Sequence, residues 1–475
     1  MSRHARTTTV VMFLGWLALG WSGAVSAAKL IAFSDLHLDP MADPSLVEAL
    51  LAADVTAWPE ILDRGNASYG RFGKDATWPL VRSALDQMRA VEPEPTFLLL
   101  TGDLLAHRFR DLFDAAVPLQ DRELYDGFVL KTVSFLAQEI TRRFPGKRVF
   151  LALGNNDDYC GDYMLSPDGP FLADTQRLAR RLLQVSDSER FDHGWDTGRG
   201  YDVANGAIPG LRMIFLNSVF FAPGYDQACA PAAVDDPGGE AMSWLASRLA
   251  SAERAGDRVW LLMHIPPGAD AYATLMHGGC AGGVRAMWTA PETEWFVHLL
   301  VHYRRTVAAV FAGHTHMDEF RLVGQDASRQ GVVLVTPGTS PIFGQNPGFD
   351  VYSHDPAGRL VDRETWALNN LAEAGPFHAP AWSREYRFFE LWGGVGLDAP
   401  GFADLAQRIG DDPAARAAWY SAFRVGRTAA WDEPGGPARL PASVFQAYRC
   451  AMTDVAPEAY RRCLCGETDP VTRQP

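Results

Sequence analysis

Short apolar runs recur along the chain, and longer segments with helical periodicity separate them. The runs are rich in Val, Leu, Ile and Phe, and each ends in a small or polar residue, which is typical of buried strands. They cover residues 29–34, 96–101, 148–153, 213–217, 258–263, 307–312 and 332–336. This pattern predicts a sheet structure whose strands are buried on both faces.

Helical patterns lie between several of these runs, at residues 78–91, 127–143 and 240–255. In the third pattern, Trp244, Leu245 and Leu249 share one face. Residues 349–368 differ, because two extended runs flank the turn sequence Asp355-Pro356-Ala357-Gly358 and predict a hairpin. Strands that alternate with helices indicate a layered α/β fold.

The strand signals fade beyond about residue 370. Asp412-Pro413 and Leu440-Pro441 each precede a segment with helical periodicity, and a proline in the first turn is typical of a helix start. We therefore expect a catalytic α/β domain at residues 28–370 and a helical C-terminal subdomain at residues 371–475.

The N-terminal segment has the pattern of a secretory signal peptide. Basic residues precede an apolar run at residues 10–21, and small residues follow at 25–28. A transmembrane helix needs about 20 apolar residues, so this run is too short for a typical span. We expect residues 1–27 to be removed and the mature chain to be periplasmic or secreted; an uncleaved N-terminal anchor is the alternative.

The charge balance limits the possible partners. The chain has 43 Lys and Arg against 57 Asp and Glu, a net charge of −14. Such a surface repels polyanions, so we expect neither a nucleic-acid duplex as partner nor stable membrane insertion. A metal centre can still attract a small phosphorylated substrate. No partner protein is evident from the sequence.

Metal-type residues follow five of the predicted strands. In an open α/β sheet, ligands bind at the carboxyl ends of the strands, so these residues should converge on one crevice. Imidazole and carboxylate together suit a divalent ion of borderline softness. A single histidine or aspartate after a strand is usually a loop residue, and only the whole set indicates a metal centre. The set is Asp35, His37, Asp103, Asn155, His264, His314 and His316.

The order of these blocks, D-x-H, G-D, G-N, H and G-H-x-H, resembles the calcineurin-like metallophosphoesterases. The chain is more closely similar to the acid sphingomyelinase-like phosphodiesterases, through the segments at residues 102–107 (GDLLAH), 264–268 (HIPPG), 346–348 (NPG) and the tail from Cys450 to Cys463. The resemblance implies a layered α-β-β-α metallophosphoesterase sandwich.

The resemblance also implies the division of the ligands. Asp35, His37 and His316 would hold one ion and Asn155, His264 and His314 the other, with Asp103 bridging them. Four histidines favour zinc, with manganese or iron as alternatives. A metal-activated hydroxide would then attack the phosphorus of a small phosphodiester or a nucleotide phosphoanhydride.

Two further residues are candidates for catalysis. His107 matches the family position that protonates the leaving group, and the unperturbed pKa of histidine near 6.5 suits that task. Asn156 stands where the acid sphingomyelinase family commonly has histidine; an amide can donate a hydrogen bond to a phosphoryl oxygen but cannot deliver a proton. Either His107 alone acts as the acid, or Asp157 or Asp158 assists it.

Six cysteines in an exported chain allow several disulfide pairings. The resemblance implies a pair between Cys450 and Cys463. We also expect a pair between Cys229 and Cys280, whereas Cys160 and Cys465 have no assignment.

Several functional alternatives stay open at this point. Sphingomyelin hydrolysis and phosphomonoester hydrolysis use the same metal ligands. A metal-stabilised binding protein without activity is a third possibility, although the complete ligand set and His107 count against it. No saposin-like segment precedes Asp35, and the acidic chain lacks a basic amphipathic helix, so we expect soluble substrates to be preferred over lipid. Residues 220–221 and 382–392 are the best candidates for an exposed apolar rim, unless they pack in the core.

Overall fold

The structure is a computed structural model of the 475-residue chain. It describes residues 27–65, 68–118, 121–184, 195, 198–204, 207–228, 234–324, 331–427 and 442–466. The predicted signal peptide lies outside the described residues apart from Ala27. No helix within the described part of the chain is long and apolar enough to cross a membrane.

Two six-stranded sheets form the centre of the molecule. In the first sheet, the strand order is β12-β11-β10-β1-β2-β3; β1, β2 and β3 are parallel, and β10 joins β1 antiparallel. Its strands are β1 Ala28–Phe33, β2 Leu98–Leu100, β3 Val149–Leu151, β10 Gly348–His354, β11 Leu360–Leu368 and β12 Trp382–Arg387.

The second sheet has the order β4-β5-β6-β7-β9-β8. Its four central strands are parallel, and the edge strands β4 and β8 are antiparallel to their neighbours. Its strands are β4 Gly200–Ala204, β5 Leu211–Leu216, β6 Arg258–Leu262, β7 Val307–Ala312, β8 Glu319–Val323 and β9 Gly331–Val335.

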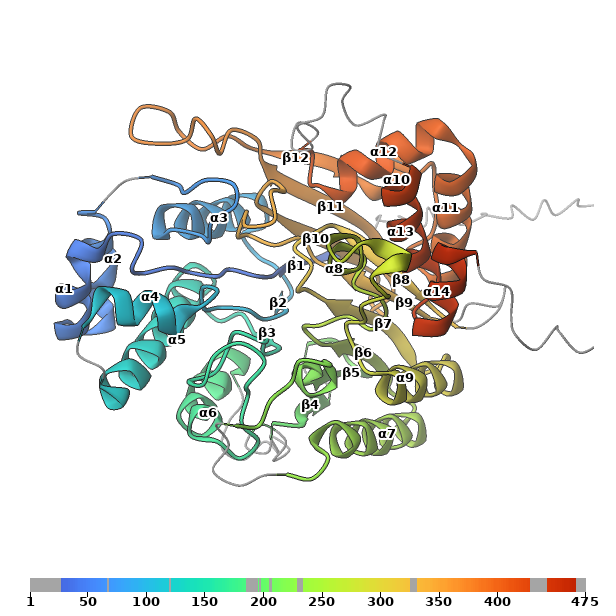
Figure 1. The fold of residues 1–475 in the computed structure, drawn as a ribbon, viewed down its shortest axis with the longest axis horizontal. Coiled ribbons are helices and arrows are strands. Elements are labelled where there is room, and N and C mark those ends of the chain that lie inside the picture. The colour runs from blue at the N-terminus through green and yellow to red at the C-terminus, as the bar shows by residue number, and fades with distance from the viewer. Residues whose placement is uncertain are drawn as a thin grey trace, which may run out of the picture.

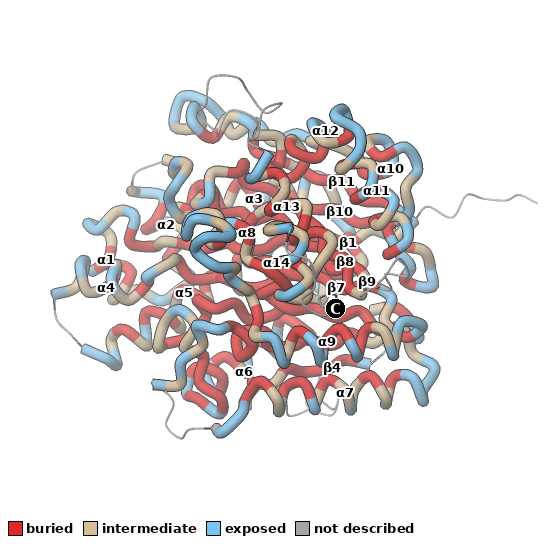
Figure 2. Tube along the Cα trace, turned by 45° about the vertical axis from the view of Figure 1, so that its right-hand side comes forward, coloured by how far each residue is buried: buried red, intermediate tan, exposed pale blue. Residues whose placement is uncertain are grey.

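Aromatic side chains fill the space between the two sheets. Phe97, which directly precedes β2, contacts Trp260 of β6 with ring centroids 5.7 Å apart. Phe150 of β3 contacts Phe215 of β5 at the same separation. Buried residues accordingly concentrate in the strands at the centre of the molecule (Figure 2). This shared core fixes the two sheets against each other, so the ends of their strands have defined relative positions.

Helices cover the outer faces of both sheets (Figure 1). Helices α5 and α6 pack together on the side of β3, whereas α7 packs on β5 and β6. The helices of the α/β part are α1 Val47–Ala52, α2 Trp58–Leu62, α3 Trp78–Val91, α4 Phe109–Ala116, α5 Arg122–Arg143, α6 Pro170–Leu183, α7 Pro237–Ala255, α8 Ala271–Met276 and α9 Ala290–His302. The expected layered α-β-β-α sandwich is confirmed.

The predicted strands and the hairpin are all present, but three further strands were missed. Strands β4, β8 and β12 lie at sheet edges. The sequence of β12, Trp-Ser-Arg-Glu-Tyr-Arg, is largely polar, and edge strands often carry charged side chains. The expectation that strand structure ends near residue 370 was therefore wrong at this point.

Helices dominate the chain after β12. They are α10 Phe388–Leu391, α11 Ala399–Asp411, α12 Pro413–Phe423, α13 Ala442–Thr453 and α14 Pro457–Cys465. Asp412 caps α12 as expected, because its carboxylate accepts a hydrogen bond from the Ala414 amide. Helices α11 and α13 pack on β8. The exact domain boundary at residue 370 stays a prediction.

Two disulfides attach the C-terminal helices. Cys450 pairs with Cys463, as expected. Cys280 pairs with Cys465, so the expected pair of Cys229 with Cys280 was wrong. The reason is tertiary: the end of α14 packs beside residues 279–281, which brings the two Cα atoms to 5.7 Å. Cys160 is also disulfide-bonded, and Cys229 lies outside the described residues.

Candidate metal centre

The ends of β1, β2, β6 and β7 meet at one point between the two sheets. The Asp35 amide donates to the Gly102 carbonyl at 3.0 Å, and the Gly313 amide donates to the His264 carbonyl at 2.9 Å. Ser34 and Gly338 form an isolated bridge beside them. The segments after the strands are therefore hydrogen-bonded together, and they bring side chains from residues 35 to 316 into one site.

Five of the seven predicted ligand residues have a left-handed backbone. Their φ values are 51° at Asp35, 37° at His37, 55° at Asp103, 75° at His314 and 62° at His316. This conformation is unfavourable for residues other than glycine and is concentrated at functional sites, where the surrounding structure enforces it. The strain turns each side chain sharply inward immediately after its strand.

The glycines of the motifs allow the segments to approach closely. A Cβ atom on Gly154 would lie 2.0 Å from Asp103 Oδ1, and one on Gly313 would lie 2.1 Å from Ser34 Oγ. Neither position has room for a side chain. The glycine in G-N and G-H-x-H is therefore required by backbone packing around the site.

One group of donors comes from β1 and β7. His37 Nε2 lies 3.3 Å from Asp103 Oδ2 and 3.7 Å from Asp35 Oδ1, and His316 Nε2 lies 3.4 Å from Asp35 Oδ1. The Nε2 atoms of His37 and His316 face each other at 3.2 Å. All these side chains are buried.

The second group surrounds the other side of Asp103. His264 Nε2 lies 3.1 Å from Asp103 Oδ2 and 3.0 Å from Asn155 Oδ1. His314 joins Asp103 and His264 in a cluster whose potential ligand atoms all lie within 4.8 Å of one another. Asp103 is thus the residue common to both groups.

Backbone carbonyls orient three of the histidines. Nδ1 of His37 donates to Leu105 O at 2.8 Å, Nδ1 of His264 to Thr101 O at 2.7 Å, and Nδ1 of His316 to Ser340 O at 2.9 Å. With the proton on Nδ1, each Nε2 carries a lone pair directed into the site. A backbone carbonyl that accepts from the other ring nitrogen is a usual partner of a metal-ligating histidine. Two such lone pairs facing each other repel unless a cation lies between them, so the donor set fits divalent metal.

The electrostatics also indicate a site for cations. Burial opposes charge on His37, but Asp103 and Asp35 raise its pKa to about 10. Burial likewise opposes charge on His264, and Asp103 raises its pKa to about 9. The two buried carboxylates therefore attract positive charge strongly. When metal is absent, protons on His37 and His264 supply that charge. Burial lowers the pKa of His314 to about 3, so it is neutral, the form that binds metal.

His107 lies beside this group and has a partner that the sequence did not reveal. Its Nδ1 lies 2.9 Å from Asp75 Oδ1, and its backbone amide donates to Asp75 Oδ2 at 2.8 Å. Its ring stacks on His37 with centroids 4.0 Å apart. Burial raises the pKa of Asp75, but the hydrogen bonds from His107 outweigh this and lower it. Asp75 thus fixes the orientation of the His107 imidazole.

Asn156 is hydrogen-bonded to the carboxylate of Asp103. Its amide side chain donates to Asp103 Oδ2 and its backbone amide to Oδ1, both at 2.9 Å. Asp157 accepts backbone hydrogen bonds from Asp103, Leu104, Leu105 and Gly154, so it holds the segment after β2. Asp158 accepts a bond from the Cys160 amide at 2.7 Å. Neither Asp157 nor Asp158 lines the pocket that His107 borders. Their positions therefore do not support the suggestion that one of them assists His107.

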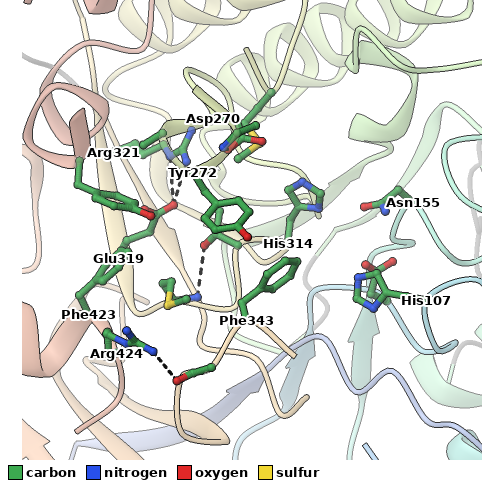
Figure 3. Close-up of a pocket in the computed structure, with 18 of the residues that line it drawn as sticks. His107, Asn155, Asp270, Tyr272, His314, Glu319, Arg321, Phe343, Phe423 and Arg424 are labelled. Atoms are coloured by element: carbon green, nitrogen blue, oxygen red, sulfur yellow. Dashed lines mark hydrogen bonds and ion pairs between the residues drawn. The ribbon is translucent and has the colours of Figure 1, made fainter. Parts of the chain in front are cut away.

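The site opens into a pocket of about 530 Å³ (Figure 3). Asp103, His107, Asn155 and His314 lie at one end of it, and Tyr163 adds a hydroxyl 3.4 Å from His314 Nε2. The far wall comes from the start of α8, from β8, from the loop after β9 and from the end of α12. It includes Asp270, Tyr272, Glu319, Phe343, Phe423 and Arg424. None of these wall residues, nor Tyr163, carries a recognisable signal in the sequence.

Comparison with known proteins identifies the family of this chain. The fold and the cluster of histidine and aspartate donors define a metal-dependent hydrolase of phosphoric esters. The family profile of the calcineurin-like phosphoesterases matches residues 28–318. The chain belongs to this family, whose members are dinuclear metal enzymes.

The resemblance to the acid sphingomyelinase-like subgroup is also confirmed. Human acid sphingomyelinase-like phosphodiesterase 3b is 27% identical, over 97% of this chain and 96% of that protein. Rat cyclic GMP-AMP phosphodiesterase SMPDL3A is 26% identical over 82% of each chain. Human sphingomyelin phosphodiesterase is 29% identical over 77% of this chain and 55% of its own.

Proposed function

We propose that this chain is a phosphodiesterase that hydrolyses small phosphodiesters or nucleotide phosphoanhydrides at a two-metal centre. The observation that carries the proposal is the convergence of six candidate donors around Asp103, all of them buried except the partly exposed His314, at one end of a pocket that His107 also lines. A pocket of this size suits a small ligand rather than a polymer.

The proposed ligand division follows the two groups of donors. Asp35, His37 and His316 would hold one ion and Asn155, His264 and His314 the other, with Asp103 shared. Zinc fits four imidazoles best, and manganese or iron are the alternatives. When bound, two such ions supply Lewis acidity: they make water a nucleophile at neutral pH and offset the charge on the phosphoryl oxygens.

In this proposal, His107 protonates the leaving oxygen. Asp75 Oδ1 accepts a hydrogen bond from the Nδ1–H of His107, which leaves Nε2 to carry the transferable proton. The His37 ring stacks against the His107 face and limits its rotation. Asn156 would act through Asp103, because both of its observed hydrogen bonds go to that carboxylate.

We expect Asp75→Asn to impair the acid without emptying the metal site. The substituted amide can donate to Nδ1 and so favour the wrong imidazole tautomer. For a diester with an alkyl leaving group, kcat should fall by about 10- to 100-fold, which is less than complete loss of acid catalysis causes. Nitrophenyl esters should be affected less, because nitrophenolate leaves without a proton. A loss that is equal for both esters, or a loss of metal, would assign Asp75 a purely structural role.

The proposed substrates are soluble. Phe220 and Phe221 are buried, so they do not form the apolar rim that the sequence allowed. We expect kcat/KM for a soluble diester such as CDP-choline to exceed that for sphingomyelin, both in detergent micelles and in vesicles. Efficient turnover in neutral vesicles without a helper protein would contradict this expectation.

Sphingomyelin is the second candidate because of three exposed side chains. Tyr272 is 52% exposed, Met276 on the same helix 68%, and Phe343 41%. Tyr272 and Phe343 line the pocket, with ring centroids 6.0 Å apart. An apolar rim at a pocket can contact lipid, and the vesicle measurement decides between the two substrates.

We further propose that the chain is exported, to the periplasm or the medium. The disulfides of the C-terminal helices support this, since such bonds persist in oxidising compartments. N-terminal sequencing of protein recovered from those fractions should begin at residue 28; a start at residue 1 would contradict cleavage.

A further inference from the structure

Tyr163 brings a phenol hydroxyl to the second group of donors. Its Oη lies 3.4 Å from His314 Nε2, and the two rings meet edge to face with centroids 6.3 Å apart. Tyr163 and His314 line the same pocket as the candidate acid His107 (Figure 3). His107 lies beside the first group, where its ring stacks on His37. Each group of donors therefore has one neighbouring side chain at the pocket that can donate a hydrogen bond.

The backbone of Tyr163 is fixed on the candidate ligand Asn155. The Tyr163 amide donates to the Asn155 carbonyl at 2.9 Å, and Asn155 Nδ2 donates to Asp162 Oδ1 at 2.6 Å. The Tyr163 carbonyl accepts from the Asp226 amide at 3.0 Å. Tyr163 has a left-handed backbone with a φ of 57°, as have five of the candidate ligands. This conformation is unfavourable for tyrosine and persists only where the surrounding structure enforces it, so the ring has a defined position.

His314 differs from the other three candidate histidine ligands in its hydrogen bonds. Those three use Nδ1 to donate to a backbone carbonyl. Among the residues that the structure describes, Nδ1 of His314 has no such partner, and Tyr163 lies at Nε2 instead. A histidine that binds metal is neutral, with one N–H and one lone pair. With Nδ1 as the ligand atom, Nε2 carries the hydrogen and donates it to the Tyr163 oxygen.

This arrangement leaves the hydroxyl hydrogen of Tyr163 free for an acceptor in the pocket. A hydroxyl whose oxygen accepts one hydrogen bond can still donate another. Within the described part of the chain, no carboxylate or carbonyl accepts from Tyr163 Oη. The contact with His314 is long, as catalytic hydrogen bonds commonly are before a ligand binds. A charged phosphoryl oxygen is a strong acceptor, and it suits a donor at this position.

We propose that Tyr163 is a further catalytic residue, whose hydroxyl donates a hydrogen bond to a non-bridging oxygen of the substrate phosphoryl group. The inference rests on the proposed function. These oxygens carry negative charge in the transition state, and a donor that is already oriented stabilises this charge without reorganisation. Tyr163 transfers no proton, because a phenol is a much weaker acid than an imidazolium. Its role therefore differs from that of His107, which acts on the leaving oxygen.

The first test compares phosphate binding by the wild type and by Tyr163→Phe, which keeps the ring and removes only the hydroxyl. Both proteins are loaded with metal, and metal analysis verifies two ions per chain. Calorimetric titration with inorganic phosphate then measures binding of a phosphoryl group without turnover. We expect the dissociation constant of the variant to be about tenfold higher, in keeping with the loss of one hydrogen bond to a charged group.

The second test separates Tyr163 from His107 by the leaving group. p-Nitrophenylphosphocholine and glycerophosphocholine share a phosphoryl group but release nitrophenolate and an alkoxide. Tyr163→Phe should lower kcat/KM for both esters by the same factor, about 10- to 100-fold, because the non-bridging oxygens are common to both. His107→Ala should instead affect the alkyl ester more. A loss in Tyr163→Phe that is confined to one ester would overturn the assignment.

The matched control is Tyr225→Phe. Tyr225 is also partly buried, but its hydroxyl donates to the Leu165 carbonyl at 3.0 Å and it does not line the pocket. Phosphate affinity and both rates should be unchanged in this variant.

Two further results would also decide the matter. A Tyr163→Phe variant that cannot be loaded with two ions, or that binds phosphate and hydrolyses both esters normally once loaded, would make Tyr163 only a structural partner of His314. Either outcome would overturn the inference alone. A wild type that holds two ions but hydrolyses neither ester would overturn the proposed function, and with it the catalytic role of Tyr163.

Discussion

Asp103→Asn should lose both metal and activity while the protein stays folded. Asp103 Oδ2 lies 3.3 Å from His37 Nε2 and 3.1 Å from His264 Nε2, so it is the one carboxylate shared by the two groups of donors. An amide has the same shape but no charge, and it leaves two buried sets of histidines without their common anion. We expect fewer than two ions per chain and a rate lowered by more than about 100-fold, since even partners that only orient metal ligands contribute up to about that factor.

Metal analysis of the purified variant, together with kcat on a nitrophenyl diester, measures both effects. Circular dichroism and thermal melting show whether the fold persists. The matched control is Asp111→Asn, which removes a carboxylate from the exposed surface of α4. An Asp103 variant that retains two ions and normal turnover would contradict the bridging role.

His107→Ala should slow turnover and leave the metal content unchanged. His107 is about a quarter exposed, with 26% of its side chain accessible, and it borders the pocket beside the buried donors. If it is the sole acid, loss of the imidazole should lower kcat by about 10²- to 10⁴-fold for alkyl leaving groups. The loss should shrink for nitrophenolate, which departs without a proton.

The informative measurement is the dependence of kcat on leaving-group pKa in the wild type and in the variant. A steeper dependence in the variant supports acid catalysis. His298→Ala, an exposed histidine on α9, is a suitable control. An equal loss across all leaving groups would mean that His107 positions the substrate instead.

Much of the fold could be predicted because its strands are buried on both faces. Such strands are continuous apolar runs, and all of the predicted runs appear in the two sheets. The missed strands β4, β8 and β12 lie at sheet edges, where one side of the strand has no neighbour and polar residues are tolerated. A continuous apolar run is recognisable in a sequence, whereas Glu319 and Arg321 interrupt the apolar pattern of β8 although that strand is fully buried.

The candidate ligands could be found because each stands directly after a strand. The geometry of parallel strands brings such residues together without any knowledge of side-chain contacts. Asp75 had no such signal: it precedes α3, and only tertiary packing brings it to His107. The same is true of the pair Cys280 and Cys465, which are 185 residues apart in sequence.

The sequence by itself therefore determined the class of fold and the candidate donors of the metal centre, because these depend on local pattern and strand direction, whereas the candidate acid followed from the resemblance to a known family. The tertiary structure alone decided how the acid is oriented, which cysteines pair and what surrounds the reacting phosphorus. Those features depend on distances between segments that are remote in the chain, such as Tyr272 and Phe343 at the pocket or Asp75 and His107. Such distances arise only when the two sheets and the C-terminal helices pack together.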